Sequence, residues 1–344
     1  MGFKQEIDLR SDTVTRPGKG MLEAMMSAKV GDDVFGEDPT IALLEEKVSS
    51  RFGKESGLFC PTGTMCNQIA IHVHCQPGDE ILCDATSHIY NYESGGAAFN
   101  SRVQVKIING PGGQMSASQI LENLNDTQDW LARTCMVAVE NTANRAGGSI
   151  YSIQQLKEIE LVCKKNALKF HMDGARVFNA LAESGDDPEK IGKLFDSVSV
   201  CFSKGLGAPV GSILLGSRDF IRQARRVRKV LGGGMRQAGI LAAACIYALD
   251  HHLPLLKEDH RKAKIIGEKL KSLAIVEEVL PVYTNIIIFK LGAGKNAADF
   301  AKLLATKNIK ASAFRGQIMR FVTHLDFNNE MLDYVLDQLN YTAS

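Results

Sequence analysis

The sequence Ser199-Val200-Cys201-Phe202-Ser203-Lys204-Gly205-Leu206-Gly207 places one lysine between an apolar run and a glycine-rich turn. The apolar run predicts a buried strand, and the glycines predict a sharp turn after it. An ammonium group at the end of a buried strand is costly unless it has a partner or a chemical use. One such use is a Schiff base with an aldehyde. Lys204 is therefore the first candidate functional residue, and a surface lysine in a loop is the alternative.

A carboxylate follows a second apolar run in the segment His171-Met172-Asp173-Gly174-Ala175-Arg176. Pyridoxal phosphate (PLP) requires a lysine for its aldehyde carbon and a carboxylate that keeps its ring nitrogen protonated. Lys204 and Asp173 together predict a PLP site, and Arg176 follows Asp173 closely in the sequence. The alternative is a plain ion pair between Asp173 and Arg176.

Short apolar runs alternate with longer segments of helical periodicity over the first 250 residues. This alternation predicts an α/β fold with a mainly parallel, seven-stranded sheet and helices on both faces. Ligands bind beyond the carboxyl ends of the strands in such sheets, which is where Lys204 and Asp173 fall. The predicted strands are 57–60, 80–83, 103–108, 136–140, 169–173, 197–202 and 211–216, and predicted helices include 41–52, 65–75 and 153–166.

The pattern changes near residue 250, where His251-His252-Leu253-Pro254 interrupts a helical segment. A charged helix is predicted over 256–273, strands over 285–290 and 319–323, and helices over 296–306 and 329–340. The chain is therefore predicted to form a large ligand-binding domain over 1–250, with an N-terminal arm, and a small C-terminal α+β domain over 251–344.

Two other polar segments follow strand ends. Thr62-Gly63-Thr64 precedes an amphipathic helix, and the free N–H groups of a helix start favour an anion such as phosphate. The alternative is an ordinary threonine N-cap with a turn glycine. His88 follows the predicted strand 80–83 and can stack on a heteroaromatic ring or transfer a proton near neutral pH. A hydrogen-bonded surface histidine is the alternative there.

Composition argues against several classes of protein. The net charge is +1, so no global field favours nucleic acid or an anionic membrane, and no apolar run has the length of a bilayer span. The basic segment 218–229 lacks interleaved aromatic residues, which favours a solvated helix face; Lys229 and Arg236, on either side of three glycines, are its candidates for phosphate binding. The eight cysteines show no metal-ligand spacing, so no metal site is predicted, and reduced thiols in the cytoplasm are expected.

Five motifs together resemble one known family. They are SDTVTRP at 11–17, GDDVFGEDPT at 31–40, DGAR at 173–176, SKGLGAP at 203–209 and GGGMRQ at 232–237. Their order is similar to that of the low-specificity L-threonine aldolases, which belong to the β-eliminating lyase group of fold-type I PLP enzymes. The resemblance runs from Ser11 to Arg320 and implies cleavage of L-threonine or L-allo-threonine to glycine and acetaldehyde. A PLP-dependent β-eliminating lyase or racemase acting on another amino acid is the alternative, and a non-enzymatic binding protein is disfavoured.

The resemblance also implies roles for single residues. It implies a Schiff-base lysine at 204, a partner of the pyridine nitrogen at Asp173, and a histidine stacked on the ring at 88. The remaining implied roles are cofactor contacts at Gly63, Thr64 and Arg176, binding of the substrate by Ser11, Tyr92 and Arg320, and contributions of Lys229 and Arg236 to a neighbouring subunit's phosphate site. Shared sites imply a homo-oligomer, expected to be a tetramer built as a dimer of dimers.

Two positions differ from the family pattern. Members often read Glu-Asn-Thr-His-Asn where this chain reads Glu140-Asn141-Thr142-Ala143-Asn144, and Phe35 stands where many have tyrosine. The family histidine lies near the substrate β-hydroxyl, so Ala143 removes a candidate proton acceptor. His88 is then the expected base, acting directly or through a water.

Overall fold

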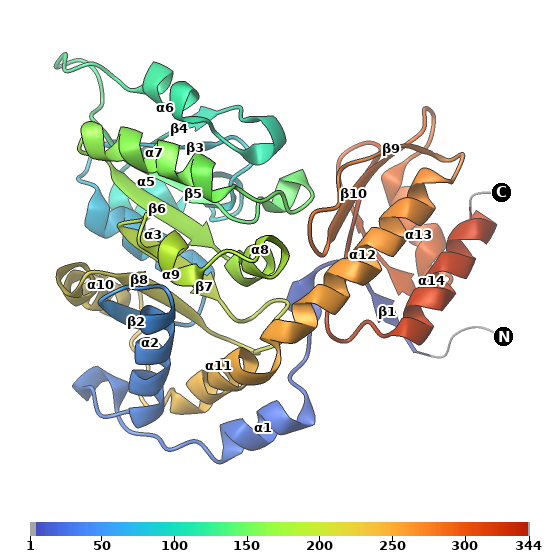
Figure 1. Cartoon of the computed structure of the whole chain (residues 1–344), viewed down its shortest axis with the longest axis horizontal. Coiled ribbons are helices and arrows are strands. Elements are labelled where there is room, and N and C mark those ends of the chain that lie inside the picture. Colours follow the sequence, from blue (N-terminus) through green and yellow to red (C-terminus); the bar gives the residue numbers. More distant parts are fainter. Residues whose placement is uncertain (1–4, 343–344) are drawn as a thin grey trace.

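The computed structural model describes residues 5–342, and one large sheet dominates them (Figure 1). Its seven strands have the order β2-β8-β7-β6-β5-β3-β4. The pairs β3–β4, β3–β5, β5–β6 and β6–β7 are parallel, whereas β8 is antiparallel to both neighbours. The predicted, mainly parallel seven-stranded sheet is therefore confirmed. Its strands are β2 (Ser56–Cys60), β3 (Glu80–Asp84), β4 (Gln104–Ile108), β5 (Thr134–Glu140), β6 (Lys169–Gly174), β7 (Ser197–Cys201) and β8 (Ser212–Gly216).

Helices cover both faces of this sheet (Figure 1). One face packs against α3 (Gly63–His74), α4 (His88–Asn91), α5 (Gly96–Ser101) and α10 (Arg218–Val230). The other face packs against α1 (Lys19–Met26), α2 (Pro39–Arg51), α6 (Ala117–Asn123), α7 (Ile153–Lys165), α8 (Val177–Ser184), α9 (Pro188–Gly192) and α11 (Gly239–His251). Side-chain caps begin several of them: Asp38 accepts from the backbone of Thr40 and Ile41 at the start of α2, and Ser152 caps α7.

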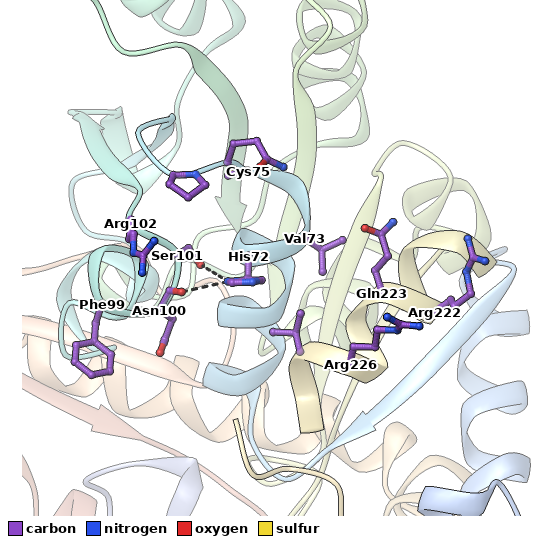
Figure 2. Close-up of a pocket in the computed structure, with 13 residues that line it drawn as sticks. His72, Val73, Cys75, Phe99, Asn100, Ser101, Arg102, Arg222, Gln223 and Arg226 are labelled. Carbon is purple, nitrogen blue, oxygen red and sulfur yellow. Dashed lines mark hydrogen bonds between the residues drawn. The ribbon is translucent and has the colours of Figure 1, made fainter. Parts of the chain in front are cut away.

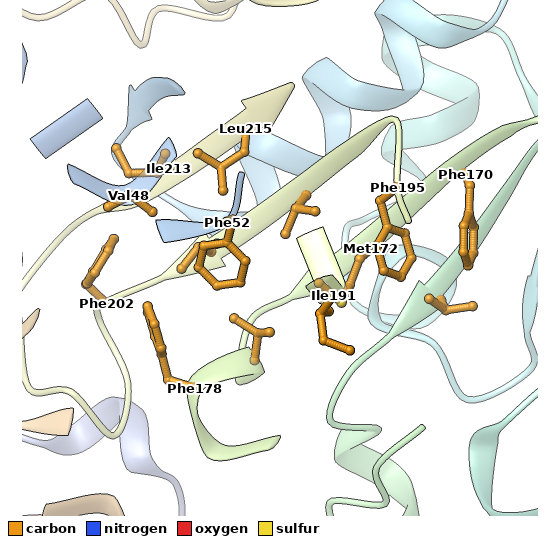
Figure 3. Packing of buried hydrophobic residues seen from close by; sticks show 14 of the residues in the cluster. Val48, Phe52, Phe170, Met172, Phe178, Ile191, Phe195, Phe202, Ile213 and Leu215 are labelled. Carbon is orange, nitrogen blue, oxygen red and sulfur yellow. The ribbon is translucent and has the colours of Figure 1, made fainter. Parts of the chain in front are cut away.

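Side chains along each strand point alternately to the two faces of the sheet, and each face has its own hydrophobic core. On β5, Val137 and Val139 belong to the larger core, whereas Met136 and Ala138 belong to the core under α4 and α5. Figure 3 shows the larger core, in which phenylalanine rings fill the space between helices and sheet. On β6 the apolar residues Phe170 and Met172 point into this core. His171 and Asp173 therefore lie on the opposite face, under α3.

A second unit follows α11. It contains α12 (Leu256–Lys271) and a four-stranded antiparallel sheet of order β12-β13-β10-β9. The strands β9 (Val276–Val279), β10 (Ile286–Leu291), β12 (Ser312–Ala313) and β13 (Ile318–Val322) pack with α13 (Ala297–Ala305) and α14 (Asn329–Thr342). β1 (Ile7–Asp8) pairs with β11 (Ile309–Lys310), so the N-terminal arm is hydrogen-bonded to this unit. The predicted domain boundary at residue 250 stays a prediction. Residues 1–4 of the first predicted domain and 343–344 of the second lie outside the described residues.

Within residues 5–342, each helix taken alone is too short or too polar to cross a bilayer. The segments Gly239–His251 and Leu253–Lys271, bent by 55° at the break between them, meet the length and composition criteria only as a pair.

Candidate active site

The lysine at 204 lies in the turn that leaves β7. The Gly207 N–H donates to the Lys204 carbonyl (2.8 Å), and Gly207 has a φ of +75°, a conformation that glycine adopts without strain. Lys204 Nζ donates to Cys201 Sγ at 3.3 Å. Burial is the largest influence on Lys204 and would lower its pKa, but attraction by Cys201, Asp12 and Asp173 together raises it. The turn therefore holds the amine against the end of β7, where the sequence predicted it.

Asp173 stands at the end of β6 and is 4% exposed. Its Oδ1 accepts from the Ala175 N–H (3.0 Å), and its Oδ2 accepts from Asn67 Nδ2 (2.8 Å). Asn67 comes from α3, the helix that crosses this face of the sheet. The carboxylate is thus fixed in orientation by one backbone and one side-chain donor.

A chain of buried polar groups supports Asn67 from below. His171 Nε2 lies 3.1 Å from Asn67 Oδ1, and His171 Nδ1 lies 2.8 Å from Ser197 Oγ, which in turn lies 2.8 Å from His74 Nε2. Because an amide oxygen only accepts, His171 carries its proton on Nε2 and accepts from Ser197. Burial lowers the pKa of His171 to about 4 and that of His74 to about 3. Both imidazoles are therefore neutral, and their tautomers set the direction in which Asn67 faces Asp173.

His88 begins α4, and its side chain reaches the same place. His88 Nδ1 donates to Glu93 Oε1 (3.0 Å), and side-chain atoms of His88, Glu93 and Asp173 lie within 4.8 Å of one another. Burial would lower the pKa of His88, but the hydrogen bond to Glu93 and the charge of Asp173 raise it. The Tyr92 ring, 44% exposed, is centred 5.6 Å from the imidazole. With Nδ1 bound to Glu93, Nε2 is the nitrogen available to a ligand.

Glu140 ends β5 beside Asp173, with which it is paired in register. Its carboxylate accepts from the His88 N–H (2.9 Å) and the Asn144 N–H (3.1 Å). Burial raises the pKa of Glu140 to about 7, and the Asp173 charge adds to the rise. A buried carboxyl group that titrates near neutrality is a common feature of active sites.

Sequence reasoning missed Asn67, Glu93 and Glu140 as site residues. Glu140 had a usable signal, because it ends the predicted strand 136–140 as Asp173 ends its own strand. Asn67 and Glu93 had none, because a polar residue inside a helix or in a turn becomes part of a site only through the packing of α3 and α4.

The N-terminal arm reaches the site through Asp12. Arg176 donates to both carboxylate oxygens of Asp12 at 2.7 and 2.6 Å, and the two side chains are 5% and 0% exposed. The structure therefore gives Arg176 a different partner from the Asp173 of the plain ion-pair alternative. Asn285 of the second unit adds a bond to Asp12 (3.2 Å). Ser11, the neighbour of Asp12, accepts from the N–H and hydroxyl of Thr13.

Arg320, on β13, approaches from the second unit. Its Nη1 donates to Asn144 Oδ1 and its Nη2 to the Arg10 carbonyl, both at 2.9 Å. Burial lowers the pKa of Arg320 to about 10, and repulsion from Arg176 and Arg145 contributes. The Arg320 Nε is buried, and within residues 5–342 it has no hydrogen-bond partner. The second unit thus supplies a cation with an unsatisfied donor.

Thr62, Gly63 and Thr64 form the first turn of α3. Thr62 Oγ1 accepts from the Met65 N–H at 3.1 Å, so the threonine N-cap, which was the alternative to an anion site here, is present. The N–H groups of Gly63 and Thr64 are among the helix-start donors that have no intrahelical acceptor. A Cβ on Gly63 would lie 3.3 Å from Cys201 Sγ, which is tight, so glycine allows the turn to sit close to the end of β7.

Lys229 and Arg236 lie elsewhere on the subunit. Lys229 is exposed at the end of α10, and Arg236 forms an ion pair with Asp32 (2.9 Å) while its guanidinium lies over the Phe35 ring. Phe35 is 74% exposed. The buried Arg228 pairs with Asp33 at 2.7 Å, so the basic helix is not solvated along its whole length. Ala143 is 2% exposed and packs near the Gly113 turn.

A separate cavity of about 660 Å³ lies between α3, α5 and α10 (Figure 2). Its lining includes His72, Phe99, Arg102, Arg222 and Arg226. His72 Nδ1 is held there by the Asn100 carbonyl (3.2 Å) and the Ser101 hydroxyl (3.4 Å). The lining of this cavity contains none of the predicted site residues.

Comparison with known proteins fits this geometry. The family model described as "Beta-eliminating lyase" matches residues 8–293. The chain belongs to the β-eliminating lyase family. It is 42% identical to the low specificity L-threonine aldolase of Escherichia coli K12 over 95% of its own length and 96% of that protein. It is 40% identical to low-specificity L-threonine aldolase 1 of Arabidopsis thaliana, over 96% of this chain and 95% of the relative.

A solved structure shows the shared fold. The threonine aldolase of Leishmania major superposes with a TM-score of 0.83 at 20% identity, covering 98% of this chain and 100% of that one. The predicted fold class and the predicted family resemblance are therefore confirmed.

Proposed function

We propose that this protein uses PLP to cleave L-threonine and L-allo-threonine to glycine and acetaldehyde. The observation that carries the proposal is the meeting of Lys204, Asp173 and His88 at the carboxyl edge of the parallel strands. The names of the curated relatives, at 40–42% identity over nearly the whole chain, support the same reaction.

The residues at this edge fit PLP. Lys204 can take the aldehyde, and the Asp173 carboxylate, held by the Asn67 and Ala175 donors, can face a ring nitrogen. The free N–H groups of Gly63 and Thr64 suit the phosphate, and the hydrogen atom of Gly63 leaves the approach open. When bound, PLP supplies an electron sink for the bond that breaks at the substrate Cα.

Substrate orientation is assigned to the arm and the second unit. Arg320, with its unsatisfied Nε, and the Ser11 hydroxyl would hold the substrate carboxylate. Fixing this group would orient the Cα–Cβ bond of the substrate for cleavage. The buried Asp12–Arg176 pair ties Ser11, the neighbour of Asp12, to the sheet, and Arg176 would lie close to the cofactor. Tyr92 would line the outer wall beside His88.

His88 would act as the general base of the reaction. Glu93 fixes the proton of His88 on Nδ1, so Nε2 can accept the proton of the substrate β-hydroxyl, directly or through a water. The Cα–Cβ bond then breaks, acetaldehyde leaves, and Cα takes up a proton to become glycine. Glu140, whose pKa is about 7, lies one hydrogen bond from the His88 backbone and completes the proton-holding groups of the site.

A homo-oligomer with shared sites, expected to be a tetramer, is part of the proposal. Lys229 is exposed and Arg236 pairs with Asp32 at the surface, which would suit a role in a neighbouring subunit's phosphate site. Exposed apolar residues lie on the same part of the surface, with Phe35 at 74% and Val230 at 85% exposure. A second copy of this chain would cover them. All eight cysteines are free, including the contacting thiols of Cys75 and Cys135, which supports a cytoplasmic location.

The product assay separates this proposal from its alternative, a β-eliminating lyase or racemase acting on another amino acid. The PLP-loaded protein is incubated with L-threonine, L-allo-threonine and L-serine. Equal amounts of aldehyde and glycine are expected from both threonine isomers. Ammonia with a keto acid, or inversion at Cα without cleavage, would favour the alternative.

A further inference from the structure

Arg145 stands at the mouth of the site without an acidic partner. It follows Asn144 in the segment that leaves β5, and its side chain is half-buried. Its guanidinium carbon lies 3.7 Å from the centre of the Phe314 ring and 5.4 Å from the centre of the Tyr92 ring. No carboxylate within residues 5–342 lies within ion-pair distance of it. Two aromatic rings therefore hold this cation in place while leaving its charge uncompensated.

A second guanidinium shares the same ring. The Arg320 guanidinium carbon lies 5.3 Å from the Phe314 ring centre, and Asn144, the residue before Arg145, accepts from Arg320 Nη1. Like charges this close repel, and repulsion from Arg145 helps to lower the pKa of Arg320. Such an arrangement costs stability unless an anion is bound between or beside the two groups.

Space beside Arg145 is set by small residues. Ala143 and Ala146 flank the Asn144-Arg145 pair, and both methyl groups lie beside the glycine turn at Gly113. No aromatic or charged side chain from these two positions therefore stands between Arg145 and the Tyr92 wall. Arg320 already serves one carboxylate in the proposed reaction, so Arg145 is left for a second anionic group.

We propose that Arg145 binds an acidic group carried on the substrate Cβ, so that the preferred substrates are β-hydroxy amino acids with a second carboxylate. This inference rests on the proposed function for its reaction. 3-Hydroxyaspartate is the simplest member of the class: its hydroxyl proton leaves to the base, its Cα–Cβ bond breaks, and Cα is protonated. The products are glyoxylate and glycine, and no oxidant or reductant is required.

Binding can be tested without the reaction. L-Aspartate carries a carboxylate on Cβ and L-2-aminobutyrate carries a methyl group, and neither has a hydroxyl to cleave. Calorimetric dissociation constants are measured on the PLP-loaded wild type, on Arg145→Gln, and on Arg315→Gln as a control at an exposed arginine of the same loop as Phe314. A charged hydrogen bond corresponds to roughly a ten- to hundredfold preference for aspartate in the wild type. Arg145→Gln should remove this preference, and Arg315→Gln should keep it.

The other outcomes overturn the proposal. Equal weakening of both amino acids by Arg145→Gln would mean that Arg145 holds the α-carboxylate, and an unchanged preference would mean that it holds neither. If Arg145→Gln does not fold, Arg145→Met decides, because it keeps most of the side-chain volume without the charge and should also lose the preference. Cleavage is then followed by glyoxylate release from 3-hydroxyaspartate. An aspartate preference without any cleavage of threonine would uphold the anion site and contradict the proposed reaction.

Discussion

Replacing Asp12 by asparagine should destabilise the protein far more than an ordinary surface substitution. The change removes the charge that pairs with Arg176, whose side chain is only 5% exposed and donates hydrogen bonds to Asp12 at 2.6 and 2.7 Å. Breaking a buried pair from one side costs about 3–5 kcal/mol, because the remaining charge is left without a partner. The loss should also loosen the contact between the arm and the second unit, since Asn285 bonds to the same carboxylate.

The pH dependence of the stability gives a second value for the contribution of Asp12. Burial would raise the pKa of Asp12, but the charge and hydrogen bonds of Arg176, together with Lys204 and Asn285, outweigh burial and lower the pKa from 3.8 to about 2. A lowered pKa means that the folded protein binds the proton less readily than the unfolded chain, so this contribution is complete above about pH 4. It is lost as the pH falls toward 2, and it amounts to between about 2 and 3 kcal/mol. In Asp12→Asn this part of the pH dependence should disappear.

The assay is urea denaturation followed by circular dichroism at one protein concentration, at pH 7 and at pH 3. Asp299→Asn is the matched control, because its pair with Lys302 is 72% and 80% exposed and should contribute less than about 1 kcal/mol. In a double-mutant cycle with Arg176→Met, the two losses should not add. If Asp12→Asn costs no more than the control, the reasoning about this pair is wrong.

Three further predictions concern other parts of the account. Because burial lowers the pKa of His171 to about 4, the unfolded chain binds a proton at this residue below about pH 6.5 that the folded protein does not bind, which lowers the stability by about 2 kcal/mol between pH 7 and pH 5. Glu140, whose pKa is raised to about 7, acts in the opposite direction over this range, so the quantity to measure is the difference between the wild type and His171→Gln; the same pH dependence in both proteins would contradict the assignment. Ala143→His should raise threonine turnover or sharpen the preference between its two isomers, at a cost of about 1–3 kcal/mol from overpacking beside Gly113; a folded variant with unchanged rate and preference would show that the position is not catalytic. Mixing Lys204→Ala subunits with Arg236→Ala subunits should restore some activity if sites are shared, and a fully active monomer by light scattering would contradict this.

The long elements of the fold were predictable from the sequence. All seven strands of the large sheet were predicted to within two residues at each end, because each is an apolar run bounded by turn residues. The two-residue strands β1, β11 and β12 were not predicted, since two residues carry no periodicity. β1 forms by pairing with β11, which lies about 300 residues away in sequence, and a local sequence pattern does not reveal such a partner.

The candidate site was predictable where chemistry coincides with a strand end. Lys204, Asp173 and His88 follow three parallel strands, and the structure brings them to one edge. The partner of Arg176 was not predictable, because Asp12 is brought to it only when the arm folds back over the sheet. The same holds for Arg145, whose neighbours Phe314 and Tyr92 come from separate parts of the chain.

The most direct test of the central claim is borohydride reduction of the PLP-loaded protein followed by peptide mass mapping. The account predicts a single pyridoxyl adduct, on Lys204. The Lys204→Ala variant, in which every other lysine is unchanged, should carry no adduct. Lys54 is a useful internal comparison, because burial lowers its pKa and favours a reactive amine outside the site. An adduct on Lys54 or any other lysine in place of Lys204, or none with PLP in excess, would contradict the account.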